Sequence, residues 1–151
     1  MNARESNLEQ TLKHAIIHLA PKRWNGITNG FCGLIRGAYV IDRAVRLADV
    51  LPIQVLEDAF MVEGRTALAD AAGVFADLSN NVETGLLRTG WTNDDVPHTI
   101  VRDAERWNAD LAVVGTHGRR GVGRWFLGSV AARTARISHT PLLLARPKLD
   151  T

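Results

Sequence analysis

The stretch VVGTHGRRGVGRWFLGSV, residues 113–130, decides the fold. It opens as the end of a short apolar run over 110–115 that stops at a glycine, which is typical of a strand buried on both faces. A loop rich in glycine and arginine follows, and a helix pattern begins at Gly128-Ser129. Glycine lets a backbone come close to an anion, and the unpaired N–H groups at a helix start favour negative charge. The sequence therefore predicts a phosphate-binding loop at the carboxyl end of a strand.

Strand and helix patterns alternate on both sides of this stretch. Short apolar runs predict three further strands, at 52–56, 82–87 and 142–145. Helical spacing predicts three helices, at 64–75, 96–107 and 129–137. Asn108 suits a left-handed cap at the end of the second helix, and Ser129 suits a side-chain cap at the start of the third. This alternation predicts an α/β fold with a parallel sheet and helices on both faces.

The first 50 residues are less regular. An apolar run predicts a strand over 14–19, and Val40, Ala44 and Leu47 predict a helix over 39–50. Between them lies a long glycine-rich stretch, which we interpret as an insertion around 20–38. With that insertion, residues 1–151 form one domain.

Composition excludes several classes of protein. Hydrophobic residues make up 46% of the 151 residues and charged residues 23%, an ordinary globular mix. The longest apolar runs are far too short to span a bilayer, and the polar N-terminus does not have the pattern of a secretory signal, so a cytoplasmic protein is expected. One cysteine and five scattered histidines predict no disulfide and no metal site.

Charge is distributed unevenly. The formal net charge is +2, from 18 basic and 16 acidic residues, yet the segment 111–148 contains seven basic residues and no acid. Such a split indicates either a solvated basic face or the end of the molecule that meets an anion.

The loop itself is unlike those of common phosphate-cleaving enzymes. It contains no lysine of the P-loop type and no nearby acid to hold Mg²⁺, and its glycines do not complete a dinucleotide-binding fingerprint. Ser129 has no histidine and aspartate in view to make it a nucleophile. The loop is suited to hold phosphate and not to cut it.

The spacing of four residues carries a family resemblance. Gly115, Gly118, Gly128 and Ser129 follow the pattern of glycine, two residues, glycine, nine residues, then glycine with serine or threonine. In this pattern the chain resembles the nucleotide-binding members of the universal stress protein family, and the resemblance extends over 39–147. It implies a three-layer Rossmann-like sandwich with a five-stranded parallel sheet. It also implies bound ATP, with or without Mg²⁺, and a homodimer formed through the last strand, Leu142 to Arg146.

The resemblance also implies a set of nucleotide-binding residues. Those at the loop and helix start are Val114, Gly115, Thr116, Gly118, Arg119, Gly128, Ser129 and Val130. Leu56, taken as the end of the second strand, would lie near adenine. One position departs from the family, whose first strand ends in an aspartate that holds the ribose. If 14–19 is that strand, Ala20 stands in place of the aspartate.

Three functions remain open at this point. The first is a stress-response regulator or protective factor that binds ATP without fast catalysis, and the intact glycine-serine pattern favours it. The second is a family member that binds no nucleotide and acts as a dimeric interaction module, which the missing aspartate favours. The third is a slow ATPase, which needs an acid from outside 111–148. Nucleic-acid binding ranks last, because only Trp125 and Phe126 offer stacking platforms in the basic region.

Overall fold

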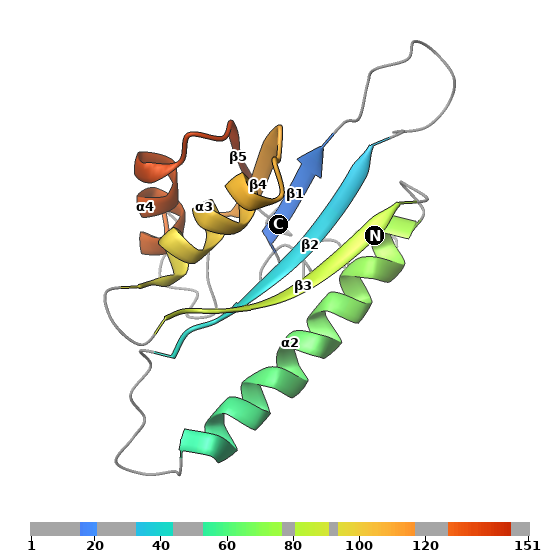
Figure 1. The fold of residues 1–151 in the computed structure, drawn as a ribbon, viewed down its shortest axis with the longest axis vertical. Coiled ribbons are helices and arrows are strands. Elements are labelled where there is room, and N and C mark those ends of the chain that lie inside the picture. The colour runs from blue at the N-terminus through green and yellow to red at the C-terminus, as the bar shows by residue number, and fades with distance from the viewer. Residues whose placement is uncertain are drawn as a thin grey trace, which may run out of the picture.

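The computed structural model describes residues 16–20, 33–43, 53–76, 81–90, 94–116 and 127–145. Along the chain these contain β1 (Ile16–Ala20), β2 (Leu34–Ile41), α2 (Ile53–Ala76), β3 (Val82–Arg88), α3 (Val96–Arg106), β4 (Leu111–Gly115), α4 (Ser129–Ile137) and β5 (Leu142–Ala145). The strands form one sheet, with α2 on one face and α3 and α4 on the other (Figure 1). The predicted α/β class with helices on both faces of a sheet is confirmed for this part of the chain.

The order of strands in the sheet is β3-β2-β1-β4-β5. β2 and β3 are parallel, and so are β4 and β5, but β1 is antiparallel to both of its neighbours. Four strands therefore run one way and the central strand runs the other, so the prediction of a wholly parallel sheet is wrong at β1. A parallel β1 needs a crossover helix before β2, and the intervening sequence, with Pro21, Gly26 and Gly30, does not favour a helix.

The second strand lies earlier in the chain than the sequence predicts. Residues 34–41 form β2, so the expected helix over 39–50 is wrong for its first three residues, and 44–50 lie outside the described residues. Residues of β2 pair with β1 on one side and with β3 on the other, and this pairing decides against the helix. The expected strand at 52–56 is wrong as well, because α2 begins at Ile53 and contains Leu56. Of the proposed insertion, 34–38 belong to β2.

The remaining predicted elements are confirmed. The helix expected over 64–75 lies within α2, and those expected over 96–107 and 129–137 are α3 and α4. The strands expected over 82–87, 110–115 and 142–145 are β3, β4 and β5. Asn108 has φ 54°, as predicted for a left-handed residue after α3.

The core has a layer on each side of the sheet. On the α2 side, Ile35, Ala71, Phe75 and Val113 pack together, next to a second cluster of Tyr39, Ile41 and Leu68. On the other side, Ala38, Ile100, Val114 and Ala131 join two strands to α3 and α4. Buried apolar area on both faces is what fixes the helices against the sheet.

The approach of α2 to the sheet is closest at Gly64. A Cβ atom at this position would lie 2.6 Å from Leu86 Cδ1 and 2.8 Å from Tyr39 Cδ1. Tyr39 is only 1% exposed, so its ring has little room to move. Glycine at this position therefore allows α2 to lie directly on β2 and β3.

Candidate functional site

The carboxyl ends of β2, β3, β4 and β5 lie at the same edge of the sheet, because these strands run in one direction. Open sheets of this kind bind ligands at that edge. This edge contains the end of β4 and the start of α4, the two elements that the sequence predicts to bind phosphate.

One backbone hydrogen bond brings the two halves of the predicted phosphate site together. Gly128 N donates to Thr116 O at 2.8 Å, so the residue after β4 lies beside the residue before α4. Thr116 N in turn donates to Ala145 O at 2.8 Å, which extends the pairing of β4 with β5. Val114 is 4% exposed and Thr116 8% exposed, so a rigid strand end supports the site. The structure thus places Val114, Gly115 and Thr116 next to Gly128, Ser129 and Val130.

The first turn of α4 presents backbone donors to solvent. Gly128 O accepts the first intrahelical hydrogen bond, from Ala132 N at 2.9 Å, so the amides of residues 129–131 precede the helical ladder. Gly128, at the cap position, has no side chain with which to cap this end, and the first turn of α4 contains no acid. Ser129 and Val130 are both exposed. These are the features of an anion-binding helix start.

The role predicted for Ser129 as a cap is wrong. Gly128 occupies the cap position with φ −57° and ψ 147°, and Ser129 is the first residue of the helix proper. The Ser129 hydroxyl therefore does not cap the helix, and Ser129 is exposed in its first turn.

Three other predicted site residues have different outcomes. Gly118 and Arg119 lie outside the described residues. Leu56 lies in the first turn of α2, so the prediction that it ends the second strand is wrong. The strand end at this edge is Ile41, whose carbonyl accepts a hydrogen bond from Thr89 N at 3.0 Å. Sequence reasoning missed Ile41 because it assigned 39–50 to a helix.

The reversal of β1 changes the interpretation of Ala20. In the sheet, Leu19 pairs with Leu111 and Ala20 with Leu34, at the starts of β4 and β2. Ala20 therefore lies at the opposite edge from Gly115 and Gly128, and it does not occupy the position of a ribose-binding aspartate. Asp42, directly after β2, is an acid that does lie at the carboxyl edge.

Asp94 ties the end of β3 to α3. Its carboxylate accepts hydrogen bonds from Gly90 N at 2.7 Å, from Arg102 Nη2 at 2.8 Å and from Thr99 Oγ1 at 3.3 Å. Hydrogen bonding to Arg102 lowers the pKa of Asp94 from 3.8 to about 2, against the opposing effect of burial. The same pair raises the pKa of Arg102. Asp94 is thus an ionised anchor of the carboxyl edge.

Asp95 links α3 to α4. It caps α3 by accepting from His98 N at 3.0 Å, and it contacts His98 Nδ1 at 2.7 Å and Arg133 Nη1 at 3.0 Å. Burial alone would raise the pKa of Asp95, but the hydrogen bonds from His98 and the charge of Arg133 bring it below its usual value. Arg133, one turn into α4, therefore already has a carboxylate partner.

The part of the chain that the structure describes contains no group of three or more histidine, cysteine or acidic side chains placed to hold a metal ion. In the same residues, no helix combines the length and the hydropathy that crossing a membrane requires.

Comparison with known proteins is consistent with this geometry. A universal stress protein of Methanocaldococcus jannaschii is 29% identical over 144 residues, which cover 93% of this chain and 76% of that protein. The crystal structure of a universal stress protein family member from Burkholderia pseudomallei is similar with a TM-score of 0.55 at 28% identity, covering 75% of this chain and 73% of the other. Universal stress protein UspA from Lactobacillus plantarum has the same fold, with a TM-score of 0.59, 20% identity and coverage of 74% and 76%. Residues 35–146, from β2 to the end of β5, match the universal stress protein family, and the chain belongs to that family.

Proposed function

We propose that this protein binds an adenine nucleotide, ATP foremost, and acts as a stress-response regulator or protective factor without fast catalysis. The observation that carries the proposal is the uncapped start of α4, held beside Thr116 by the Gly128 hydrogen bond. Amides of residues 129–131 would bind the phosphate oxygens, and the Ser129 hydroxyl would add a donor. Family membership and the spacing of Gly115, Gly118, Gly128 and Ser129 support the same ligand.

The residues near α4 are suited to binding the phosphates of ATP and not to hydrolysing them. The segment 111–148 contains no acid, and Asp95 is engaged by His98 and Arg133. Phosphoryl transfer needs a carboxylate to hold Mg²⁺ and a positioned base. We therefore expect ATP to remain bound and uncut on the timescale of ordinary turnover.

The direct test is release of nucleotide from purified protein, followed by calorimetric titration of nucleotide-free protein with ATP. Co-purified adenine nucleotide, or binding in the micromolar range, supports the proposal. Absence of both, up to millimolar ATP, overturns it in favour of the dimeric interaction module.

A substitution at Val130 tests whether the phosphates of ATP bind at the first turn of α4. Val130 is 36% exposed in the first turn of α4, so a polar side chain fits there without loss of core packing. In Val130→Asp the new carboxylate would occupy the positive end of the helix and repel phosphate, and we expect ATP affinity to fall at least about tenfold. The same charge favours the helix itself, so the melting temperature should not decrease.

The matched control is Val130→Asn, which has nearly the same shape and no charge. We expect its ATP affinity to stay within about twofold of the original protein, since the helix dipole is unopposed. Equal affinities of the Asp and Asn variants would contradict phosphate binding at this turn.

We also propose that β5 forms the homodimer interface. β5 is an edge strand, and Leu143 in its middle is 53% exposed. Lysine on an edge strand disfavours pairing with another strand. Leu143→Lys should therefore shift the protein from dimer to monomer in sedimentation velocity, with an unchanged circular dichroism spectrum. A Leu143→Lys variant that sediments as a dimer would exclude β5 as the dimer interface.

A further inference from the structure

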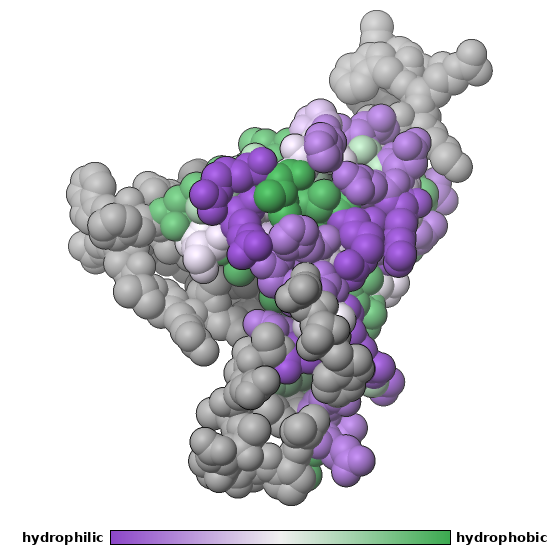
Figure 2. Space-filling model, turned by 60° about the vertical axis from the view of Figure 1, so that its left-hand side comes forward, coloured by the Kyte–Doolittle hydropathy of each residue, from purple (hydrophilic) through white to green (hydrophobic). Residues whose placement is uncertain are grey.

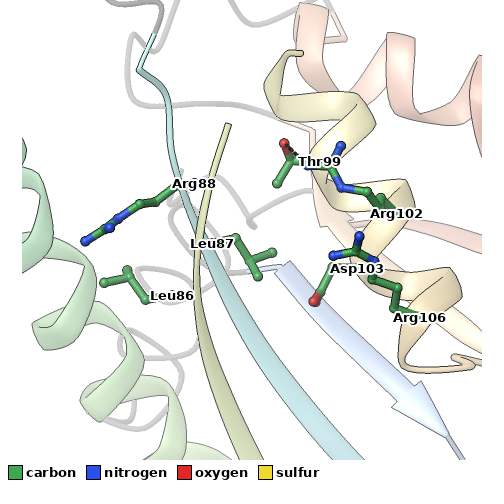
Figure 3. Close-up of a pocket in the computed structure, with 7 residues that line it drawn as sticks. All are labelled: Leu86, Leu87, Arg88, Thr99, Arg102, Asp103 and Arg106. Atoms are coloured by element: carbon green, nitrogen blue, oxygen red, sulfur yellow. Dashed lines mark hydrogen bonds between the residues drawn. The ribbon is translucent and has the colours of Figure 1, made fainter. Parts of the chain in front are cut away.

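A pocket of about 360 Å³ lies between α3 and β3, which is the outermost strand on the side of the sheet away from β5 (Figure 3). Its lining comes from three consecutive residues of β3 and from one side of α3: Leu86, Leu87, Arg88, Thr99, Arg102, Asp103 and Arg106. No residue of the proposed nucleotide site lines it. The pocket is therefore a separate candidate site, and its volume is within the range that takes small molecules.

The strand side of the pocket offers backbone donors. Asn81 O accepts from Ile35 N, and Thr89 N donates to Ile41 O, so odd-numbered residues of this strand direct their backbone groups toward β2. Because the direction alternates along a strand, Leu86 and Arg88 direct their N–H groups to the outer edge. Figure 3 shows that the side chains of Leu86 and Arg88 turn toward α2, whereas Leu87 turns toward α3. At the pocket, β3 thus provides the outward N–H and C=O groups of Leu86 and Arg88, and one apolar side chain, that of Leu87.

The helix side of the pocket contains one guanidinium more than it has carboxylates. Arg102 binds Asp94 through both of its terminal nitrogens, at 3.3 and 2.8 Å. Asp103 accepts from Arg36 Nε at 3.0 Å and from Arg36 Nη2 at 3.1 Å. Arg106 is exposed, and among the described residues no carboxylate pairs with it. Glu83 Oε2 lies 3.7 Å from Arg36 Nη1 as a third carboxylate of this cluster, and Arg106 is the arginine on the helix side of the pocket that has no carboxylate partner among the described residues.

The surroundings of these ion pairs keep them in place. Arg36 extends from β2 across Gly85, where a Cβ atom would lie 2.5 Å from Arg36 Nη2. The Asp103 and Asp94 side chains are only 12% and 11% exposed. Neither carboxylate is thus free to move out and neutralise Arg106. Figure 2, which brings the α3 and α4 side forward, shows hydrophilic side chains around a hydrophobic patch at the centre of the coloured part of this face.

We propose that this pocket binds a small organic oxyanion, a carboxylate or a phosphate monoester with a short apolar body. The oxyanion accepts hydrogen bonds from the Arg106 guanidinium and from the outward N–H groups of Leu86 and Arg88. The apolar body contacts the Leu87 side chain. A guanidinium without a carboxylate partner, next to outward N–H groups, selects an anion over a cation or a neutral polar molecule.

The test is an NMR titration of the ¹⁵N-labelled full chain with phenyl phosphate, benzoate, inorganic phosphate and benzyl alcohol. We expect phenyl phosphate or benzoate to shift the amides of residues 86–88 and 99–106. The head group that binds more tightly identifies the natural class. Benzyl alcohol should cause no shift there, because it has no charge, and inorganic phosphate should bind more weakly than phenyl phosphate, because it has no apolar body. Stronger binding of inorganic phosphate, or binding of the alcohol, would contradict the proposed ligand.

Arg106→Gln, with Arg65→Gln as its control, tests whether the anion binds in this pocket. Arg65 is an exposed arginine of α2, on the other face of the sheet. We expect the dissociation constant at the 86–88 amides to rise about tenfold in Arg106→Gln and to stay unchanged in Arg65→Gln. Equal binding by both variants, or shifts confined to residues 128–130, would overturn this inference. The second result would leave the proposed nucleotide site intact, so the two proposals fail separately.

Discussion

Replacing Gly64 by alanine should destabilise the protein, although alanine is the better helix former. The new methyl group would meet Leu86 Cδ1 at 2.6 Å and the Tyr39 ring at 2.8 Å, both closer than van der Waals contact allows. Overpacking of this kind costs about 1–3 kcal/mol, and the gain in helix propensity returns about 1 kcal/mol. We expect a net loss of up to about 2 kcal/mol in the free energy of unfolding by urea, and a larger loss for Gly64→Val.

The same change at Gly73 provides the control. Gly73 lies on the same helix, is exposed, and has nothing within 4 Å of its hypothetical Cβ. Gly73→Ala should therefore stabilise the protein by about 0.5–1 kcal/mol, through helix propensity and a less flexible unfolded chain. If both substitutions move stability in the same direction, the close approach of α2 to β2 and β3 is not the reason for glycine at position 64.

Replacing Asp94 by asparagine should cost about 2 kcal/mol at pH 7. The carboxylate is ionised down to a pKa of about 2, because it bonds to Arg102 and accepts from Gly90 N. Its folded pKa is lower than the unfolded value of 3.8, so its contribution to stability is complete above that value and is lost as pH falls toward 2. The unfolding free energies of the two proteins should differ at pH 7 and converge between pH 4 and about 2.

Asp70→Asn is the matched control for that experiment. Asp70 is exposed on α2, on the other face of the sheet from Asp94 and Arg102 (Figure 1). Its substitution should change stability by less than about 0.5 kcal/mol at any pH. A constant difference between Asp94→Asn and the original protein across the acid range would contradict the assignment of Asp94 as the titrating anchor.

The second half of the chain could be predicted from its sequence because its signals are local. Asn108 as the left-handed end of α3 follows from residue type and position alone. The apolar run 110–115 becomes β4 because it is long enough for a strand and too short for a helix. The position of the end of β4 beside the start of α4 was predictable for the same reason, since the two elements are consecutive in the chain.

The first half was harder because its structure depends on distant partners. Tyr39 and Val40 fit a helical pattern as well as a strand, and what decides between them is pairing with β1 and β3. The direction of β1 is likewise set by the sheet and not by its own five residues. The pocket at β3 was not predictable at all, because Arg106 is unmatched only once the fold has paired Arg36 with Asp103 and Arg102 with Asp94.

The direction of β1 also bears on the order in which the sheet assembles. β1 and β2 are antiparallel neighbours in both sequence and space, and they pair without a crossover helix, with residues 21–33 between them in the chain. The pairs β2–β3 and β4–β5 are parallel and must each wait for a helix to cross over. A hairpin of β1 and β2 can thus form early and present a free edge on which β4 later pairs. The central strand of this sheet would then act as the folding template for the two parallel halves on either side of it.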